Sequence, residues 1–311
     1  MNPPTAWPAL KVDDWADTRD TLQMWLQIIG KGQMVSTSLV NHWWNVTYEL
    51  SPCGLRTGLM RANGRTFDAE FDLVEHRLVL RATGGGRGSV ALEPKTVAQF
   101  YSEVQKALAD LGIDPVISAS PNEVEPAIPF AEDTTHASYD AAAVEAFFGQ
   151  LLSAERVFSE WRSGFAGKSS PPQLFWGSMD LSVTRFSGRG APDHQGGPPA
   201  CPPWVMVEAE SRENAAAGFW PGGAGEGAFY AYVYPEPAGY RDATLSTGHF
   251  DADIGEWLLP YEDVRTSTDP DAMLMAFLDE TYGLAADLGR WERSLLDVDP
   301  HRLDRYTGHT R

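Results

Sequence analysis

The feature that most constrains the fold is an order of elements that occurs twice along the chain: a helix, four short strand-like runs and a second helix. In the first half, helical periodicity flanks runs rich in β-branched and aromatic residues, separated by the turn sequences SPCG and RANGR. The helices are predicted at 14–29 and 96–111, and the strands at 42–50, 54–60, 66–73 and 76–82. Turns this short favour an antiparallel meander, which the glycine-rich run GGGRGS closes.

The second half shows the same order with longer loops. Its helices are predicted at 140–165 and 269–288, and its strands at 173–186, 204–210, 228–234 and 256–259. Trp44 aligns with Trp176, and the closing helices end in ALADLG and LAADLG. We therefore expect an α+β protein with two pseudo-repeated halves, an internal duplication and mainly antiparallel sheets.

The predicted boundaries follow the composition. Residues 1–120 form the first half, and residues 121–138 form a crossing segment rich in proline and acidic residues. Residues 139–295 form the second half, which carries the expected site because its loops are longer, and 296–311 form a polar tail.

Charge and composition exclude some classes of partner. The 43 acidic against 24 basic residues give a net charge of −19, which repels nucleic acid, and no basic cluster offsets it. No run of about eighteen apolar residues is present, so no membrane partner is expected. The two cysteines, Cys53 and Cys201, form no paired motif. We expect a cytoplasmic protein with a small-molecule ligand, and leave a homodimer open.

The run GKSSPPQLFWGSMDLSVTRFSGR concentrates polar and aromatic side chains on one predicted strand and its approach. Strand alternation puts Trp176 and Asp180 on one face. This face either lines a cleft or is an ordinary solvated face, and the indole favours the cleft. Asp180 is then a candidate for proton transfer.

Three cations nearby are candidate anchors for an anionic ligand: Lys168, Arg185 and Arg189. The alternative is that they pair with some of the many acidic residues of the chain. Aromatic side chains could complete the pocket: Trp220 before a glycine-rich loop, and Tyr232 and Tyr234 on one face of FYAYVY.

No histidine spacing typical of a metal site occurs, so no metal ligand is assigned. His136 and His194 lie in predicted loops, where His136 is a candidate for proton transfer and His194 for ligand binding. A metal held by these two histidines and neighbouring carboxylates is the alternative. We expect no organic cofactor, since no dinucleotide or P-loop fingerprint is present.

Six blocks carry a family resemblance: LVNHWWNVTYEL, RTFDAEFDLVEHRLVLR, PFAEDTTHASYD, the run beginning GKSSPP, GFWPGG and AFYAYVYPEPAGY. From about Trp7 to Trp291 the chain resembles domain-of-unknown-function family 5996, a bacterial family without an established activity. The resemblance implies that this is a divergent member, with Ser169, Gln173 and Arg212 where relatives carry a cysteine and two histidines. It therefore weakens the metal alternative.

The leading hypothesis is an enzyme acting by acid–base chemistry on a small polar or anionic metabolite. The rival is a binding or scaffold protein that uses the same cleft without turnover, and the third hypothesis is a metalloprotein.

Overall fold

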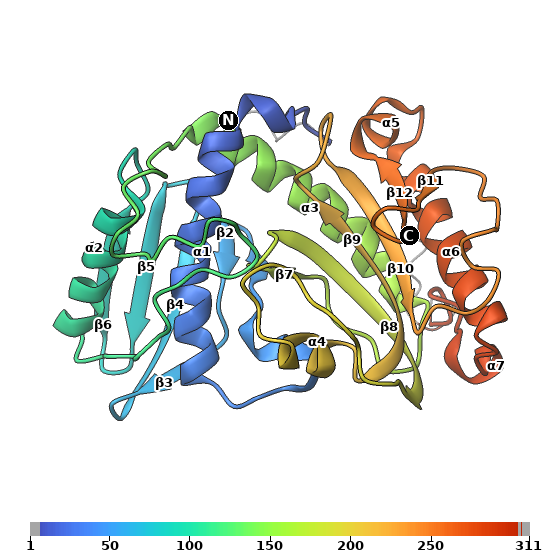
Figure 1. Cartoon of the computed structure of the whole chain (residues 1–311), viewed down its shortest axis with the longest axis horizontal. Coiled ribbons are helices and arrows are strands. Elements are labelled where there is room, and N and C mark those ends of the chain that lie inside the picture. The colour runs from blue at the N-terminus through green and yellow to red at the C-terminus, as the bar shows by residue number, and fades with distance from the viewer. Residues whose placement is uncertain (1–6, 304–305, 307–311) are drawn as a thin grey trace. The chain divides into compact units, whose positions relative to one another are not determined.

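The computed structural model describes residues 7–303 and 306, and its chain divides into two compact units (Figure 1). The first unit comprises Met1–Gln150, Gln173–Asp180 and Gln195–Ala209. The second comprises Leu151–Pro172, Leu181–His194 and Glu210–Arg311. The units thus alternate along the chain, whereas the predicted halves are contiguous. Of the predicted tail, only 296–303 and 306 are described.

An antiparallel sheet forms the centre of the first unit, in the order β1-β2-β4-β5-β6, with β3 paired to β4. Its strands are β1 (Glu49–Ser51), β2 (Gly54–Arg56), β3 (Met60–Ala62), β4 (Arg65–Asp72), β5 (Arg77–Ala82) and β6 (Gly86–Ala91). The strand β7 (Gln173–Phe175) also belongs to this unit, where Leu174 bridges Tyr48.

Helices complete the first unit. They are η1 (Val12–Asp14), α1 (Ala16–Ser36), η2 (Asn41–Val46), α2 (Val97–Asp110) and α4 (Trp204–Ala209). The α1 residue Trp25 stacks on Phe100 of α2 with ring centroids 4.5 Å apart. Phe100 also stacks on Phe71 of β4, so buried aromatic rings join both helices to the sheet.

The second unit is built on the strand order β11-β12-β10-β9-β8. Its strands are β8 (Asp180–Gly190), β9 (Arg212–Trp220), β10 (Ala228–Tyr234), β11 (His249–Asp251) and β12 (Glu256–Pro260), and its helices are α5 (Tyr261–Thr266), α6 (Pro270–Leu288) and α7 (Arg293–Leu296). The helix α3 (Ala141–Ser163) contributes residues to both units. Phe219, Phe229 and Tyr261 are fully buried in the core of the second unit.

The predicted α+β class with antiparallel sheets is confirmed. The start of α6 is also as predicted, because Asp269 caps the helix by accepting a hydrogen bond from the Ala272 N–H, with Pro270 at the first helical position. The expected internal duplication stays a prediction.

Two predicted strands are wrong. Within 42–50, residues Asn41–Val46 form η2, in which His42 and Trp43 have φ values of 62° and 60°. Trp43 Nε1 donates to the Val205 carbonyl at 2.9 Å, and this tertiary contact outweighs the strand propensity. The stretch predicted as the strand 204–210 is the helix α4, and the strand β9 begins only at Arg212.

Two predictions that were based on glycine, a helix end and a loop, are wrong. The helix α1 does not stop at Gly30 but continues to Ser36. The predicted loop GGGRGS becomes mostly β6, because the absence of side chains at Gly86 and Gly88 lets this strand approach Leu111 and Ala107 after and within α2.

The predicted strand 173–186 is interrupted. A turn at 176–179 separates β7 from β8, and Met179 in this turn has a φ of 61°. The prediction that Trp176 and Asp180 share one strand face is therefore wrong, because Trp176 lies in the turn and the alternation of side chains along β8 begins only at Asp180.

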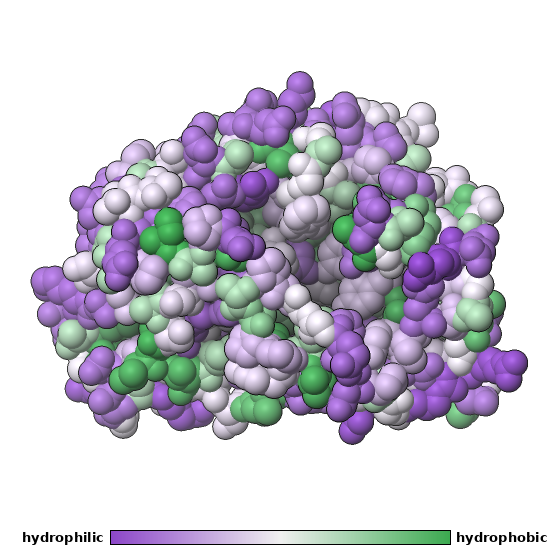
Figure 2. Space-filling view, in the orientation of Figure 1, coloured by the Kyte–Doolittle hydropathy of each residue, from purple (hydrophilic) through white to green (hydrophobic). Residues whose placement is uncertain are grey.

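Hydrophilic side chains cover much of the face shown in Figure 2, in keeping with the net charge of −19. Within the described residues, none of the helices combines the length and hydrophobicity needed to cross a membrane.

Candidate functional site

One face of α1 in the first unit carries three polar side chains spaced four residues apart: Gln23, Gln27 and Lys31. Residues at this spacing lie above one another on a helix. Gln27 and Lys31 are buried. All three side chains hydrogen-bond to loop residues, at Gly177 or at Asn122. This face of α1 therefore holds two loops in place.

Asn122 forms the hydrogen bonds with both Gln27 and Lys31. Its backbone N–H donates to Gln27 Oε1 and its carbonyl accepts from Gln27 Nε2, both at 2.8 Å. Its side-chain oxygen accepts a hydrogen bond from Lys31 Nζ, and its side-chain nitrogen donates to the Ala200 carbonyl at 2.6 Å. These bonds fix the backbone immediately before Glu123.

The Glu123 carboxyl group is the most perturbed acid of this region. Its backbone N–H donates to the Pro199 carbonyl at 2.8 Å. Burial, together with the negative charge of Asp180, raises the pKa of Glu123 from its usual 4.5 to about 7. The group can therefore hold or release a proton near neutral pH.

Asp180 is the neighbouring carboxylate. It lies at the end of the turn 176–179, and Ser178 Oγ donates a hydrogen bond to its Oδ1 at 2.5 Å. Gln23 Nε2 donates to the Gly177 carbonyl in the same turn. The Asp180 carboxylate is thus bonded by a hydroxyl group of its own turn, whereas Glu123 is held through its backbone N–H, so the two carboxyl groups have different environments.

Lys31, which hydrogen-bonds to Asn122 next to Glu123, faces the ring of Trp176, which precedes Gly177. The Lys31 ammonium lies 5.7 Å from the centroid of the Trp176 ring, within the range of a cation–π interaction. Lys31 is only 6% exposed, and burial lowers its pKa from the usual 10.5. Trp176 packs so closely on Gly30 that a Cβ placed there would lie 2.4 Å from the indole.

The backbone of this region is strained at three residues other than glycine. Glu123, Met179 and Ala200 have φ values of 59°, 61° and 53°, in the left-handed region. Such conformations cost on the order of 1 kcal/mol or more and cluster at functional sites. Glu123 belongs to the carboxyl pair and Met179 adjoins Asp180. The Ala200 carbonyl accepts a hydrogen bond from the Asn122 side chain.

Cys201 completes the group, which we call the Glu123 cluster: Lys31, Asn122, Glu123, Trp176, Asp180 and Cys201. Burial and then the charge of Glu123 raise the pKa of the Cys201 thiol, while Lys31 acts in the opposite direction. At neutral pH the thiol therefore keeps its proton, which disfavours a role as nucleophile.

Of the residues predicted for the site, Asp180 and Trp176 lie in this cluster. His136 also lies in the first unit, but its Nδ1 hydrogen-bonds to the fully buried Asp133 carboxylate at 2.7 Å. Its carbonyl accepts from the Val97 N–H at the start of α2. These contacts give His136 a structural position, and its role in proton transfer stays a prediction.

The predicted cationic anchors lie in the second unit. Arg185 is 4% exposed, and its guanidinium lies 3.5 Å from the centroid of the Trp161 ring and 4.4 Å from that of Tyr282. Burial lowers the pKa of Arg185 to about 10. The cation is thus packed inside the unit.

Arg189 pairs with Glu213 and donates to the Gly289 and Arg290 carbonyls after α6. Lys168 Nζ lies 4.8 Å from the centroid of the Phe186 ring. The internal pairing considered for these cations is thus present at Arg189. Trp220 ends β9 and remains 39% exposed.

Three other predicted residues meet in the second unit. His194 packs on Tyr234 with ring centroids 5.0 Å apart, and the Tyr232 hydroxyl hydrogen-bonds to Glu210 Oε1 at 3.0 Å. Burial raises the pKa of Glu210, while the bonds from Asn214 and Tyr232 and the charge of His194 oppose this. The structure adds Glu210 to this group, which sequence reasoning missed.

Lys31 and Glu123 were also missed. Lys31 is part of the spacing Gln23-Gln27-Lys31, a polar stripe on a helix otherwise rich in buried residues, and this stripe was a usable signal. Glu123 had no comparable signal, because its burial depends on contacts with distant parts of the chain.

No group of three or more metal-ligating side chains is found among residues 7–303 and 306. Neither the curated proteins nor the solved structures include a match to this chain. A family model does match it, over residues 7–298, which is nearly all of the sequence described above. The chain therefore belongs to DUF5996, a family of unknown function.

Proposed function

We propose that this protein is an enzyme that transfers protons to or from a small polar metabolite at the Glu123 cluster. The observation that carries the proposal is the pair Glu123 and Asp180, in which burial and the Asp180 charge raise the pKa of Glu123 to about 7. A group with this pKa is present in both protonation states at neutral pH, which general acid–base catalysis requires.

The two carboxyl groups have complementary roles in this proposal. Ser178 holds the Asp180 side chain by a hydrogen bond, and the negative charge of Asp180 makes Glu123 reluctant to ionise. Pairs of acids with separated pKa values are a recurrent basis for assigning acid and base. Glu123 transfers the proton, and the negative charge of Asp180 helps to keep the pKa of Glu123 raised.

Lys31 and Trp176 supply the means of holding a substrate. In this proposal the Lys31 ammonium attracts an anionic or strongly polar substituent, and the buried Trp176 ring that this ammonium faces forms the apolar wall beside it. This combination suits a small metabolite with an anionic group. Arg185, packed among aromatic rings in the second unit, has no part in this proposal.

The proposal needs no organic cofactor, since proton transfer between side chain and substrate is complete without one. We place the protein in the cytoplasm as part of the same proposal, because a chain with two free cysteines suits a reducing compartment.

The test incubates the purified protein with a defined mixture of small polar metabolites in deuterated water. Mass spectrometry then records which compound is consumed or gains deuterium. We expect one compound to be converted or labelled by the wild type, and the rate to fall at least about 100-fold in Glu123→Gln, which cannot exchange a proton.

The matched control is Glu125→Gln, which removes an exposed carboxylate two residues further on and should leave the rate unchanged. A compound that binds to both wild type and Glu123→Gln without being converted would instead support a binding or scaffold protein. Stoichiometric metal in protein purified without a chelating tag would support the metalloprotein hypothesis.

A further inference from the structure

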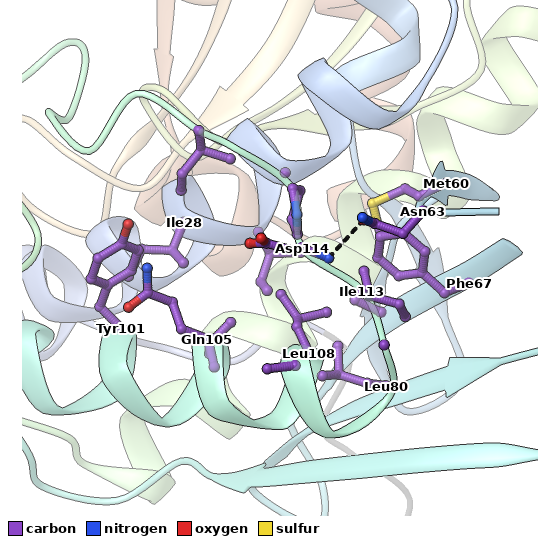
Figure 3. Close-up of a pocket in the computed structure, with 18 residues that line it drawn as sticks. Ile28, Met60, Asn63, Phe67, Leu80, Tyr101, Gln105, Leu108, Ile113 and Asp114 are labelled. Carbon is purple, nitrogen blue, oxygen red and sulfur yellow. Dashed lines mark hydrogen bonds between the residues drawn. The ribbon is translucent and has the colours of Figure 1, made fainter. Parts of the chain in front are cut away.

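A second feature of the first unit lies away from the Glu123 cluster: a cavity of about 500 Å³ bounded by α1, α2, the strands β3, β4 and β5, and the chain following α2 (Figure 3). Its lining includes Gly32, Phe67, Leu80, Tyr101, Gln105 and Asp114. A cavity of this size falls in the range of small-molecule sites.

The floor of the cavity is apolar and buried. Phe67, Leu80 and Ile113 are at most 3% exposed. Ile29 of α1 is also buried and lies on the opposite face of that helix from Gln27 and Lys31. The cavity and the Glu123 cluster therefore use two faces of one helix.

Gly32 shows that the cavity is not merely a packing gap. It is buried within α1, yet a Cβ placed on it would meet nothing within 4 Å. Glycine inside a helix costs roughly 0.5–1 kcal/mol relative to alanine. An alanine would fit here and favour the helix, so the glycine is best explained by the space that it leaves open.

The polar side chains of the lining lie toward the mouth. Gln105, Asn63 and Asp114 are exposed. In Figure 3 the Asp114 carboxylate points toward Gln105 and Tyr101, and the Asp114 N–H donates to Asn63 Oδ1 at 3.0 Å. Among the described residues of the lining, Asp114 is the one charged side chain.

We propose that this cavity binds a small amphipathic molecule with an apolar body and a hydrogen-bond-donating head, an amine or a hydroxyl. The apolar body occupies the floor beside Gly32, and the head reaches the Asp114 carboxylate and the Tyr101 and Gln105 side chains. A carboxylate head is disfavoured by Asp114 and by the net charge of −19. The site is independent of the proposed proton transfer.

The test titrates the full-length protein with N-phenyl-1-naphthylamine, an uncharged probe whose fluorescence rises in apolar surroundings. We expect saturable binding to the wild type. Gly32→Leu places a side chain in the cavity and should weaken binding at least about tenfold. Gly283→Leu is the matched control, because it changes another helical glycine, in α6, whose Cβ would meet only the end of Arg293 at 3.9 Å. Circular dichroism confirms that both variants fold.

Competition with octylamine, 1-octanol and octanoate tests which head group the cavity prefers. The first two should displace the probe and octanoate should not. In Asp114→Asn, an exposed substitution, octanoate should begin to compete. The proposal is overturned if the wild type shows no saturable binding, or if Gly32→Leu and Gly283→Leu bind the probe equally well. It is also overturned if octanoate is the best competitor for the wild type.

Discussion

The Glu123 carboxylate lies directly against the backbone of Gly177. A Cβ placed on Gly177 would lie only 1.9 Å from Glu123 Oε1, far inside van der Waals contact. The absence of a side chain at Gly177 thus lets the carboxyl group enter the turn that leads to Asp180. The raised pKa of Glu123 depends on this close approach, since burial and the Asp180 charge are its causes.

The first prediction is that Gly177→Ala displaces the Glu123 side chain and lowers its pKa toward the usual value. Carbon-13 NMR titration of the glutamate carboxyl groups measures this, with Glu123→Gln identifying the signal. Gly58→Ala is the control, because its added methyl group meets nothing within 4 Å. A Glu123 pKa that stays near 7 in Gly177→Ala would show that the contact with Gly177 is unimportant.

The second prediction concerns the dependence of stability on pH. Because the pKa of Glu123 is raised in the folded state, folded protein holds a proton that unfolded protein releases between about pH 4.5 and 7. The contribution of this bound proton to the free energy of unfolding is fully present below this window. It is lost as the pH rises through the window, which lowers the free energy of unfolding by up to about 3 kcal/mol.

Urea unfolding at several pH values checks this. The difference in the free energy of unfolding between wild type and Glu123→Gln should change across that window, in favour of Glu123→Gln at higher pH. Wild type and Glu125→Gln, which alters an exposed carboxylate, should show parallel curves. A constant difference between wild type and Glu123→Gln would contradict the raised pKa.

The third prediction is that two alanine substitutions in α1 have opposite effects. Gly30→Ala forces the Trp176 indole to move and should destabilise by about 1–3 kcal/mol, despite the gain in helix propensity. Gly32→Ala meets nothing within 4 Å and should stabilise by up to about 1 kcal/mol. Urea unfolding measures both, and effects of the same sign would be inconsistent with this packing.

The fourth prediction is that Arg185→Lys destabilises the second unit by about 1–3 kcal/mol. The planar guanidinium stacks on the Trp161 ring at 3.5 Å and donates to the Trp161 carbonyl, and an ammonium group cannot reproduce both contacts. Thermal unfolding followed by tryptophan fluorescence is the measurement. Arg241→Lys, at an exposed ion pair, should change the midpoint little.

A capping side chain predicted the start of α6 correctly, since Asp269 caps this helix. The helix α2 also begins beside Thr96 as predicted, and there the structure adds a capping box to Gln99. The alternation of FYAYVY also held, since Phe229, Ala231 and Val233 are buried along β10. These features depend on neighbours a few residues away, which a single sequence displays.

Glycine was the least predictable residue type, because its effect depends on what lies opposite. Gly30 carries the same local signal as a helix end, yet α1 continues to Ser36 and Trp176 packs on this glycine. The same limit applies to the site. Asp180 and Trp176 stood out by composition, whereas Glu123 is held by the bonds between Gln27 and Asn122, which are 95 residues apart.

Residues 113–139, all of them described, form neither helix nor strand, and their composition is that of a linker. Their backbone is nevertheless hydrogen-bonded to the helices of the first unit. Asn122 bonds to Gln27, Ser138 to Thr21 and Asp133 to Ala98. Amide exchange and proteolytic cleavage both require such bonds to open. This irregular stretch should therefore resist a glutamate-specific protease as a folded element does, and its bonded amides should exchange slowly with solvent.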